Sequence, residues 1–362
     1  MQVVAQGGGK TYTSNVYTVK SGFLPNGLPT MKVSDKNASA LFSGGGFTVN
    51  CTGIAGTTGI SGSKGTSYAF IFDKDGDMVW ALDLTNTVAT GCSRARISPD
   101  AKYMWAGNFA NVSTSGALMR VTMDGLGSPK NYAFPGRSHD FSFLPGGHVL
   151  FFQQQNGGGY TNNKEGPDWI KDLDPETGTA TTVYDETTDF ATEIANSSGA
   201  HTNFAAYIPE LKAVSFSMRH ISTVGLLSYP AGKLLTVFGG TRTAFSNMTW
   251  DVQHGHDVRS DHLWIFNNNG TGGGASVLGF RYDIASKMAT QTLNYSSGVA
   301  STAFGDVTEL PNTNLFVTYS TSGVFHEISM TGTLLREIST TTPLGYSEHL
   351  ATLYGPPPPF DR

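Results

Sequence analysis

Two histidine clusters near the middle of the sequence hold the residue types best suited to chemistry. One cluster has His201 followed by Asn203, and the other has His254 followed by His256. Both lie in segments predicted to be β-strands, where side chains two residues apart point to the same face. Imidazoles on a buried face are costly unless each ring nitrogen has a partner. The pattern therefore favours a wet pocket that handles protons, anions or a metal ion.

The strands that must position these histidines recur along the whole chain. An apolar strand, a turn rich in Gly, Asp, Asn or Pro and further strands repeat in units that begin near residues 45, 95, 139, 201, 250 and 304. Such turns are typical of β-hairpins, and units of about forty to sixty residues indicate a β-propeller. We predict an all-β fold, a single β-propeller of six four-stranded antiparallel blades around a central channel. Five or seven blades remain as alternatives.

A propeller brings residues from the start of successive units to one place, because the innermost strand of each blade lines the channel. His139, His201 and His254 each lie at the start of a unit. We therefore predict that these three histidines form one site, and the repeat aligns His254, rather than His256, with His139. The other four isolated histidines are expected to have structural roles: His148, His262, His326 and His349.

The ends of the chain differ from the repeated units. Residues 1–40 are expected to close the ring or pack across one face, and residues 41–345 to form the propeller. Residues 346–362 end in a proline run that fits neither a helix nor a central strand, so we expect an extended tail. One short helix is expected within residues 165–173.

The composition excludes several classes of protein. Of the 362 residues, 39% are hydrophobic, which supports a real core, and the net charge of −5 comes without a long basic run. Nucleic acid is therefore not an expected partner, and no apolar stretch approaches the length of a membrane helix. The abundance of Asn, Ser and Thr favours a periplasmic or secreted protein. The first residues lack a signal peptide, so the cytoplasm remains an alternative. Cys51 and Cys92 could form a disulfide, but their spacing leaves this open.

Four motifs resemble those of the bacterial aryl sulfate sulfotransferases, which work without a nucleotide sulfate donor. The resemblance runs from about residue 66 to 340, and the eighteen-residue step from His201 to Arg219 (219 − 201) matches the family. The motifs are Ser138-His139-Asp140-Phe141 before Leu144-Pro145, His201-x-Asn203 with Ser217-x-Arg219, Gln253-His254 before Phe266-x-Asn268-x-Gly270, and Gly305-Asp306-Val307 before Leu310-Pro311-Asn312.

The sequence also departs from the family pattern. The family's cysteine pair lies between the arginine and the nucleophilic histidine, whereas Cys51 and Cys92 lie elsewhere. Asn267 stands where an aspartate is expected, and His256 is a second histidine close to His254. The resemblance therefore supports the six-bladed fold more strongly than it supports the reaction.

The resemblance implies sulfuryl transfer through a covalent intermediate on a histidine. His254 would attack the sulfur of an aryl sulfate, which divides the transfer into two easier steps. Arg219 would hold the sulfuryl oxygens with its planar fork, and His201 and Asn203 would donate to the same oxygens. His139 would protonate the leaving phenolate and deprotonate the acceptor phenol.

Two further residues complete the predicted site. His256 is assigned to substrate binding, as a residue beside the nucleophile. Asp140 lies on the opposite face of its strand from His139, so we expect it to bond to a neighbouring blade. We predict small aromatic substrates, no cofactor and no metal, in a monomer or a homo-oligomer.

Two other functions remain open at this stage. A propeller lyase or related enzyme could use the same residues on an acidic sugar or small acid, with the imidazoles as base or as metal ligands. Arg219 disfavours a metal, because a cation beside a metal ion is unfavourable without a bridging anion. A non-catalytic propeller that binds a partner on its face would not need a histidine-lined channel.

Overall fold

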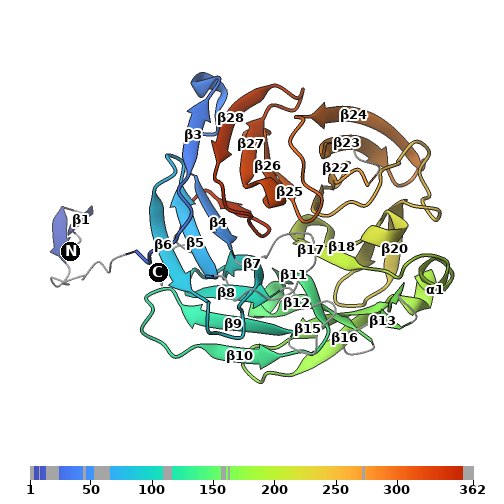
Figure 1. Cartoon of the computed structure of the whole chain (residues 1–362), viewed down its shortest axis with the longest axis horizontal. Coiled ribbons are helices and arrows are strands. Elements are labelled where there is room, and N and C mark those ends of the chain that lie inside the picture. The colour runs from blue at the N-terminus through green and yellow to red at the C-terminus, as the bar shows by residue number, and fades with distance from the viewer. Residues whose placement is uncertain are drawn as a thin grey trace.

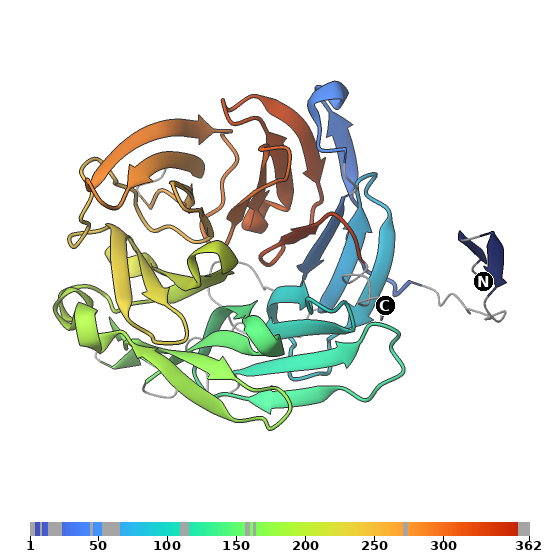
Figure 2. The same ribbon diagram turned by 180° about the vertical axis from the view of Figure 1, so that it is seen from behind.

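Six β-sheets surround a central axis in the computed structural model of the chain (Figure 1). The structure describes residues 4–7, 9–13, 24–43, 46–52, 66–108, 116–155, 160–161, 164–270 and 274–353. Neighbouring strands within every blade are antiparallel. The six-bladed propeller predicted from the sequence is therefore confirmed, and Figure 2 shows the same ring from behind.

Each of the first three blades runs outward from the strand nearest the axis. Blade one holds β29 (Glu348–Leu350), β4 (Phe47–Cys51), β5 (Tyr68–Asp73) and β6 (Met78–Asp83). Blade two holds β7 (Cys92–Ile97), β8 (Tyr103–Asn108), β9 (Ala117–Thr122) and β10 (Lys130–Ala133). Blade three holds β11 (Arg137–Phe143), β12 (Val149–Gln154), β15 (Asp168–Leu173) and β16 (Ala180–Asp185).

The last three blades follow the same order. Blade four holds β17 (Thr202–Ile208), β18 (Ala213–Met218), β19 (Thr223–Ser228) and β20 (Leu234–Gly239). Blade five holds β21 (His256–Val258), β22 (His262–Asn267), β23 (Ser276–Asp283) and β24 (Met288–Ser296). Blade six holds β25 (Asp306–Glu309), β26 (Leu315–Tyr319), β27 (Val324–Ile328), β28 (Leu334–Ser339) and a fifth strand, β3 (Lys32–Asp35).

Both ends of the chain contribute strands to the ring. β29 pairs with β4 on the inner side of blade one, and β3 pairs with β28 on the outer edge of blade six. These two strands lie outside the predicted propeller boundaries of 41–345. Pairing satisfies backbone groups that would otherwise form open edges. Residues 354–362, which include the proline run, lie outside the described residues.

A disulfide joins the first two blades. Cys51 at the end of β4 and Cys92 at the start of β7 are bonded, and both are fully buried. The carbonyl of Cys51 accepts from Gly345 N–H, and the carbonyl of Ser93 accepts from Tyr346 N–H, each at 2.8 Å. The disulfide therefore anchors the segment that leads into β29.

The expected short helix within residues 165–173 was wrong. These residues lie in β14 (Lys164–Glu165), which pairs with β13 (Tyr160–Thr161), and in β15 of blade three. Pro167 separates the two strands, and it lacks the N–H that a helix interior needs. The one α-helix among the described residues is α1 (Thr187–Asn196), which buries Phe190 and Ile194 on one face.

The remaining elements are short. A hairpin of β1 (Val4–Gly7) and β2 (Lys10–Thr13) precedes the propeller. One 3₁₀ turn, η1 (Ala38–Ala40), follows β3. Four others connect strands within the blades: η2 (Pro145–Gly147), η3 (Pro209–Leu211), η4 (Arg219–Ile221) and η5 (Ser320–Ser322). None of the helices in the described part of the chain has the length and apolarity that crossing a membrane requires.

Candidate active site

Two buried histidines and one partly buried histidine, His201, meet at the inner ends of blades three, four and five. The ring centroid of His139 lies 4.6 Å from that of His201 and 6.0 Å from that of His254, and His201 and His254 are 6.4 Å apart. One nitrogen of each ring lies within 4.8 Å of a nitrogen of the other two. The structure thus places side by side the three histidines that the repeat alignment singled out.

The backbone positions His201 in a way that strand alternation does not describe. His201 lies just before β17 and has a left-handed φ of 53°, and the pairing of β17 with β18 shifts register between Thr202 and Phe204. Such a conformation is uncommon for residues other than glycine. The prediction that His201 and Asn203 lie on one strand, with side chains on the same face, was therefore wrong.

His254 is held by Asn268, the residue that directly follows β22. Its Nδ1 lies 2.6 Å from Asn268 Oδ1, and Asn268 Nδ2 donates to the carbonyl oxygens of Ser301 and Phe304. Because these two bonds fix which end of the amide is the donor, Oδ1 must accept from the imidazole. His254 therefore carries its proton on Nδ1, and the lone pair is on Nε2.

His139 is held in the same way by its own neighbour. Ser138 Oγ donates to the carbonyl of Thr202 at 2.9 Å and lies 2.6 Å from His139 Nδ1. Since the hydroxyl proton is used on Thr202, the Oγ accepts from Nδ1–H. His139 and His254 thus share one tautomer, with Nε2 as the basic atom.

The surroundings keep both imidazoles neutral. Burial, followed by the positive charge of Arg219, lowers the pKa of His254 well below its usual value. Burial, followed by the charges of His201 and His254, lowers the pKa of His139 in the same direction. A depressed pKa favours the unprotonated ring, so each histidine has a lone pair at neutral pH.

Arg219 and Asn203 act differently on the three histidines. Arg219 begins the turn η4, and its backbone N–H donates to the carbonyl of His201 at 3.2 Å. Its charge acts on both His139 and His254, as their lowered pKa values reflect. Asn203 is fully buried and donates from Nδ2 to the carbonyl of Gln253 at 2.9 Å. Asn203 therefore supports the segment that carries His254.

His256 lies apart from the three histidines. Its Nε2 is 2.8 Å from Ser215 Oγ, and its ring packs edge-on against Phe204 with centroids 5.0 Å apart. Burial lowers its pKa to about 3. These contacts make His256 a buried link between blades four and five, and its role in substrate binding stays a prediction.

Two aromatic residues that sequence reasoning missed form one wall of the site. The ring of Phe304 lies 5.4 Å from His139 and 5.9 Å from His254, and that of Tyr346 lies 6.3 Å from His254. The two aromatic rings are 5.2 Å apart. Both precede the inner strands of their blades, so extending the repeat alignment beyond His254 could have found them.

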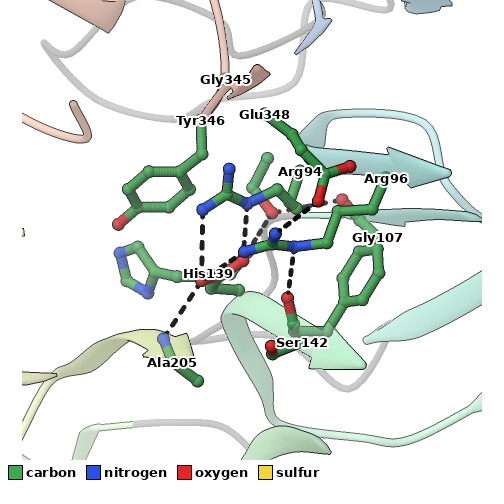
Figure 3. Close-up of polar contacts among 12 residues, drawn as sticks. Arg94, Arg96, Gly107, His139, Ser142, Ala205, Gly345, Tyr346 and Glu348 are labelled. Carbon is green, nitrogen blue, oxygen red and sulfur yellow. Dashed lines mark hydrogen bonds and ion pairs between the residues drawn. The ribbon is translucent and has the colours of Figure 1, made fainter. Parts of the chain in front are cut away.

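A buried charge cluster lies beside this wall (Figure 3). Arg94 donates to Asp140 at 2.7 Å and to Asp306 at 3.3 Å, and its guanidinium lies over the ring of Tyr346 at 4.7 Å. Asp140 also accepts from Ala205 N–H at 3.1 Å. Asp140 therefore bonds to neighbouring blades, as predicted, whereas the central role of Arg94 was missed.

The three histidines could hold a metal ion as well as an anion. Histidine ligands usually have their other ring nitrogen bound to a protein acceptor, and the bonds to Ser138 and Asn268 fit that pattern. The nearby Arg219 opposes a cation and suits an anion. The charge of the site thus favours an anionic group.

A separate cavity lies away from these histidines. A space of about 700 Å³ opens at the turns of blades two and three, and its lining includes Tyr103, Trp105, Arg120 and Phe143. None of the three channel histidines lines it. We take the three histidines, rather than this cavity, as the candidate site, because reactive side chains meet there and a cavity's volume alone does not supply a reaction.

The sequence matches one known protein family over most of its length. The sequence profile of the family described as Arylsulfotransferase (ASST) matches residues 56–344. A search of curated protein sequences finds no match.

Several solved structures share the fold. The periplasmic gluconolactonase PpgL of Pseudomonas aeruginosa is 11% identical, with a TM-score of 0.51 over 84% of this chain and 99% of that chain. A candidate 6-phosphogluconolactonase of Bacteroides fragilis is 14% identical, with a TM-score of 0.50 over 85% of this chain and 98% of that chain. Likeness at these identities concerns the fold alone.

Proposed function

This chain belongs to the arylsulfotransferase family, and we propose that it transfers a sulfuryl group from an aryl sulfate to a phenol through His254. The observation that carries the proposal is the bond between His254 Nδ1 and Asn268 Oδ1. This bond fixes the proton on Nδ1, and burial keeps the ring neutral by lowering its pKa, so Nε2 holds the lone pair that a nucleophile needs.

In the first step, His254 Nε2 attacks the sulfur and the bond between sulfur and the aryl oxygen breaks. The aryl oxide leaves with the electron pair, and the ring of His254 becomes positively charged while it carries the sulfuryl group. Asn268 Oδ1 accepts from Nδ1–H throughout, so this bond becomes charge-assisted and strengthens as the intermediate forms. The asparagine therefore favours the intermediate over the free enzyme.

Arg219 and His201 are the groups that meet the negative charge of the sulfuryl oxygens. Arg219 offers a planar fork of donors, and His201 lies beside His139 at the edge of the same group. Asn203 contributes by holding the carbonyl of Gln253 rather than the sulfuryl oxygens.

His139 is the general base of the second step. Its neutral ring takes the proton of the acceptor phenol as the phenol oxygen attacks sulfur, and the bond between sulfur and His254 Nε2 breaks. His139, whose pKa is depressed, then gives this proton to the released aryl oxide or to solvent and becomes neutral again. Because His139 is neutral at rest, the first step favours donors whose aryl oxide is a weak base. Phe304 and Tyr346 offer an apolar wall for the aryl ring.

The test is turnover of 4-nitrophenyl sulfate with phenol as acceptor. Wild-type protein should release nitrophenol and form phenyl sulfate in equal amounts, and His254→Ala should do neither. His148→Ala is the matched control, because His148 is a half-exposed histidine that pairs with Asp172 away from the channel. Equal turnover by His254→Ala and wild type would refute the proposal.

A propeller lyase or related enzyme on another small acidic substrate is the second candidate. The approach of three imidazole nitrogens within 4.8 Å favours it, since such a group could act as a base or hold a metal ion. Metal content and absence of sulfuryl transfer would distinguish it.

We also propose that the protein works in the periplasm or is secreted. A structural disulfide between Cys51 and Cys92 supports this, because disulfides persist in oxidising compartments.

A further inference from the structure

A second cluster of metal-ligating residues lies next to the channel and shares one residue with it. Glu165 Oε2 lies 2.7 Å from His201 Nδ1, and the ring centroids of His201 and His220 are 4.7 Å apart. One ligand atom of each of the three residues lies within 4.8 Å of those of the other two. The proposed transfer reaction uses neither Glu165 nor His220.

The backbone clamps these three residues together. Glu165 N–H donates to the carbonyl of Ser198 at 2.9 Å, and His220 N–H donates to that of Ala200 at 3.3 Å. Gly199 has a φ of 114°, and a Cβ there would lie 2.1 Å from the carbonyl oxygen of Glu165. Only glycine allows this close approach, so the segment before His201 is built to lie against Glu165.

Two further acidic residues lie buried beside the cluster. Asp168 and Glu186 are fully buried, and both bond to Thr202, the residue after His201. No Lys or Arg pairs with either carboxylate in the part of the chain that the structure describes, and Asp168 Oδ1 has no hydrogen-bond partner. Burial, followed by the charge of Glu186, raises the pKa of Asp168 well above its usual value.

A raised pKa favours the protonated, neutral form of a carboxyl group, so either a proton or a nearby cation can relieve the burial of Asp168. His220 has a buried Nδ1 without a hydrogen-bond partner, and His201 Nδ1 finds none in hydrogen-bonding geometry despite its nearness to Glu165. The two ring nitrogens and the carboxylate of Glu165 lie close enough together to share one ion.

We propose that Glu165, His201 and His220 bind one divalent transition-metal ion, for which Zn²⁺ is the probe. Two imidazoles and a carboxylate are ordinary zinc ligands, and three protein ligands leave a fourth position open. The charge of Glu165 acts on His220 in the opposite sense to the charge of Arg219 and offsets it. The bound ion fixes the ring of His201 at the edge of the channel. This site is separate from the metal-free transfer proposed above.

The experiment titrates metal-free, full-length protein with Zn²⁺ in competition with a coloured chelator. Wild type should bind one Zn²⁺ per chain, and His220→Ala and Glu165→Gln should each weaken binding about tenfold or more. His148→Ala should bind as wild type does. Zn²⁺ should raise the thermal unfolding temperature of wild type and much less that of His220→Ala.

Two results would overturn the proposal. One is zinc binding that His139→Ala or His254→Ala abolishes while His220→Ala retains it, since the ion would then lie among the channel histidines. The other is affinity that none of the variants changes, which would indicate surface binding. The conservative Glu165→Gln keeps the test decisive if His220→Ala folds poorly. Neither readout depends on sulfuryl transfer, so failure of the proposed function would be seen separately.

Discussion

Replacing Asn268 with alanine should slow sulfuryl transfer without removing any group that touches the substrate. The change deletes the acceptor 2.6 Å from His254 Nδ1, so the ring can rotate and the proton can move to Nε2. A hydrogen bond to a charged group is worth about 1.5–3 kcal/mol. At about 1.4 kcal/mol for each factor of ten, we expect kcat/KM for the donor to fall roughly 10- to 100-fold.

The same change has a cost in stability, which must be measured beside activity. Asn268 also donates to the carbonyl oxygens of Ser301 and Phe304, and burying either without a donor costs about 1–3 kcal/mol. Urea unfolding of Asn268→Ala therefore accompanies the kinetics, at a temperature where the variant remains folded.

The adjacent asparagine provides a matched control. Asn267 is buried like Asn268 and its Oδ1 accepts from Asp251 N–H at 3.0 Å, but it does not touch His254. Asn267→Ala should lose stability and retain most of its activity per folded molecule. A loss of less than threefold in Asn268→Ala, or an equal loss in both variants, would refute the idea that Asn268 sets the tautomer of His254.

Three further predictions follow from the buried charges, the disulfide and the depressed pKa of His254. Asp140→Ala should lower the free energy of unfolding by about 3–5 kcal/mol in urea, because it leaves the buried Arg94 without its main partner, whereas the exposed Asp75→Ala should change it by less than about 0.5 kcal/mol. Reducing the Cys51–Cys92 disulfide, which spans 41 residues, should cost about 4 kcal/mol of stability, as calorimetry with and without reductant would show; an unchanged unfolding temperature would count against it. Because the pKa of His254 is depressed, kcat/KM for the donor should stay nearly level from about pH 8 to about pH 6, and a titration centred near the ordinary histidine pKa of about 6.5 would contradict this.

The sequence was sufficient for the architecture because the repeat is strong. Units expected to begin near residues 139, 201 and 304 begin at β11 (Arg137), β17 (Thr202) and β25 (Asp306). The periodicity also identified His139, His201 and His254 as neighbours, since equivalent positions of a ring must converge. Local patterns that repeat with every blade are therefore enough to infer both the fold and the core of the site.

Features that depend on single conformations were not accessible from the sequence. The left-handed backbone of His201 and the register shift after Thr202 break the alternation from which side-chain directions were inferred. β29 has only three residues and forms because it pairs with the edge of β4, so local sequence propensity could not predict it. Arg94 lies in an ordinary strand pattern, and only the closed ring brings Asp140 and Asp306 to it.

Direct detection of a sulfuryl group on His254 is the measurement that tests the account most closely. Protein mixed with 4-nitrophenyl sulfate and no acceptor should gain the mass of one sulfuryl group, and peptide mapping under mild base should place it on His254. Adding phenol should remove that mass, and His254→Ala should never acquire it. Turnover of the donor by wild type with no added mass, or a sulfuryl group on a different residue, would contradict His254 as the nucleophile.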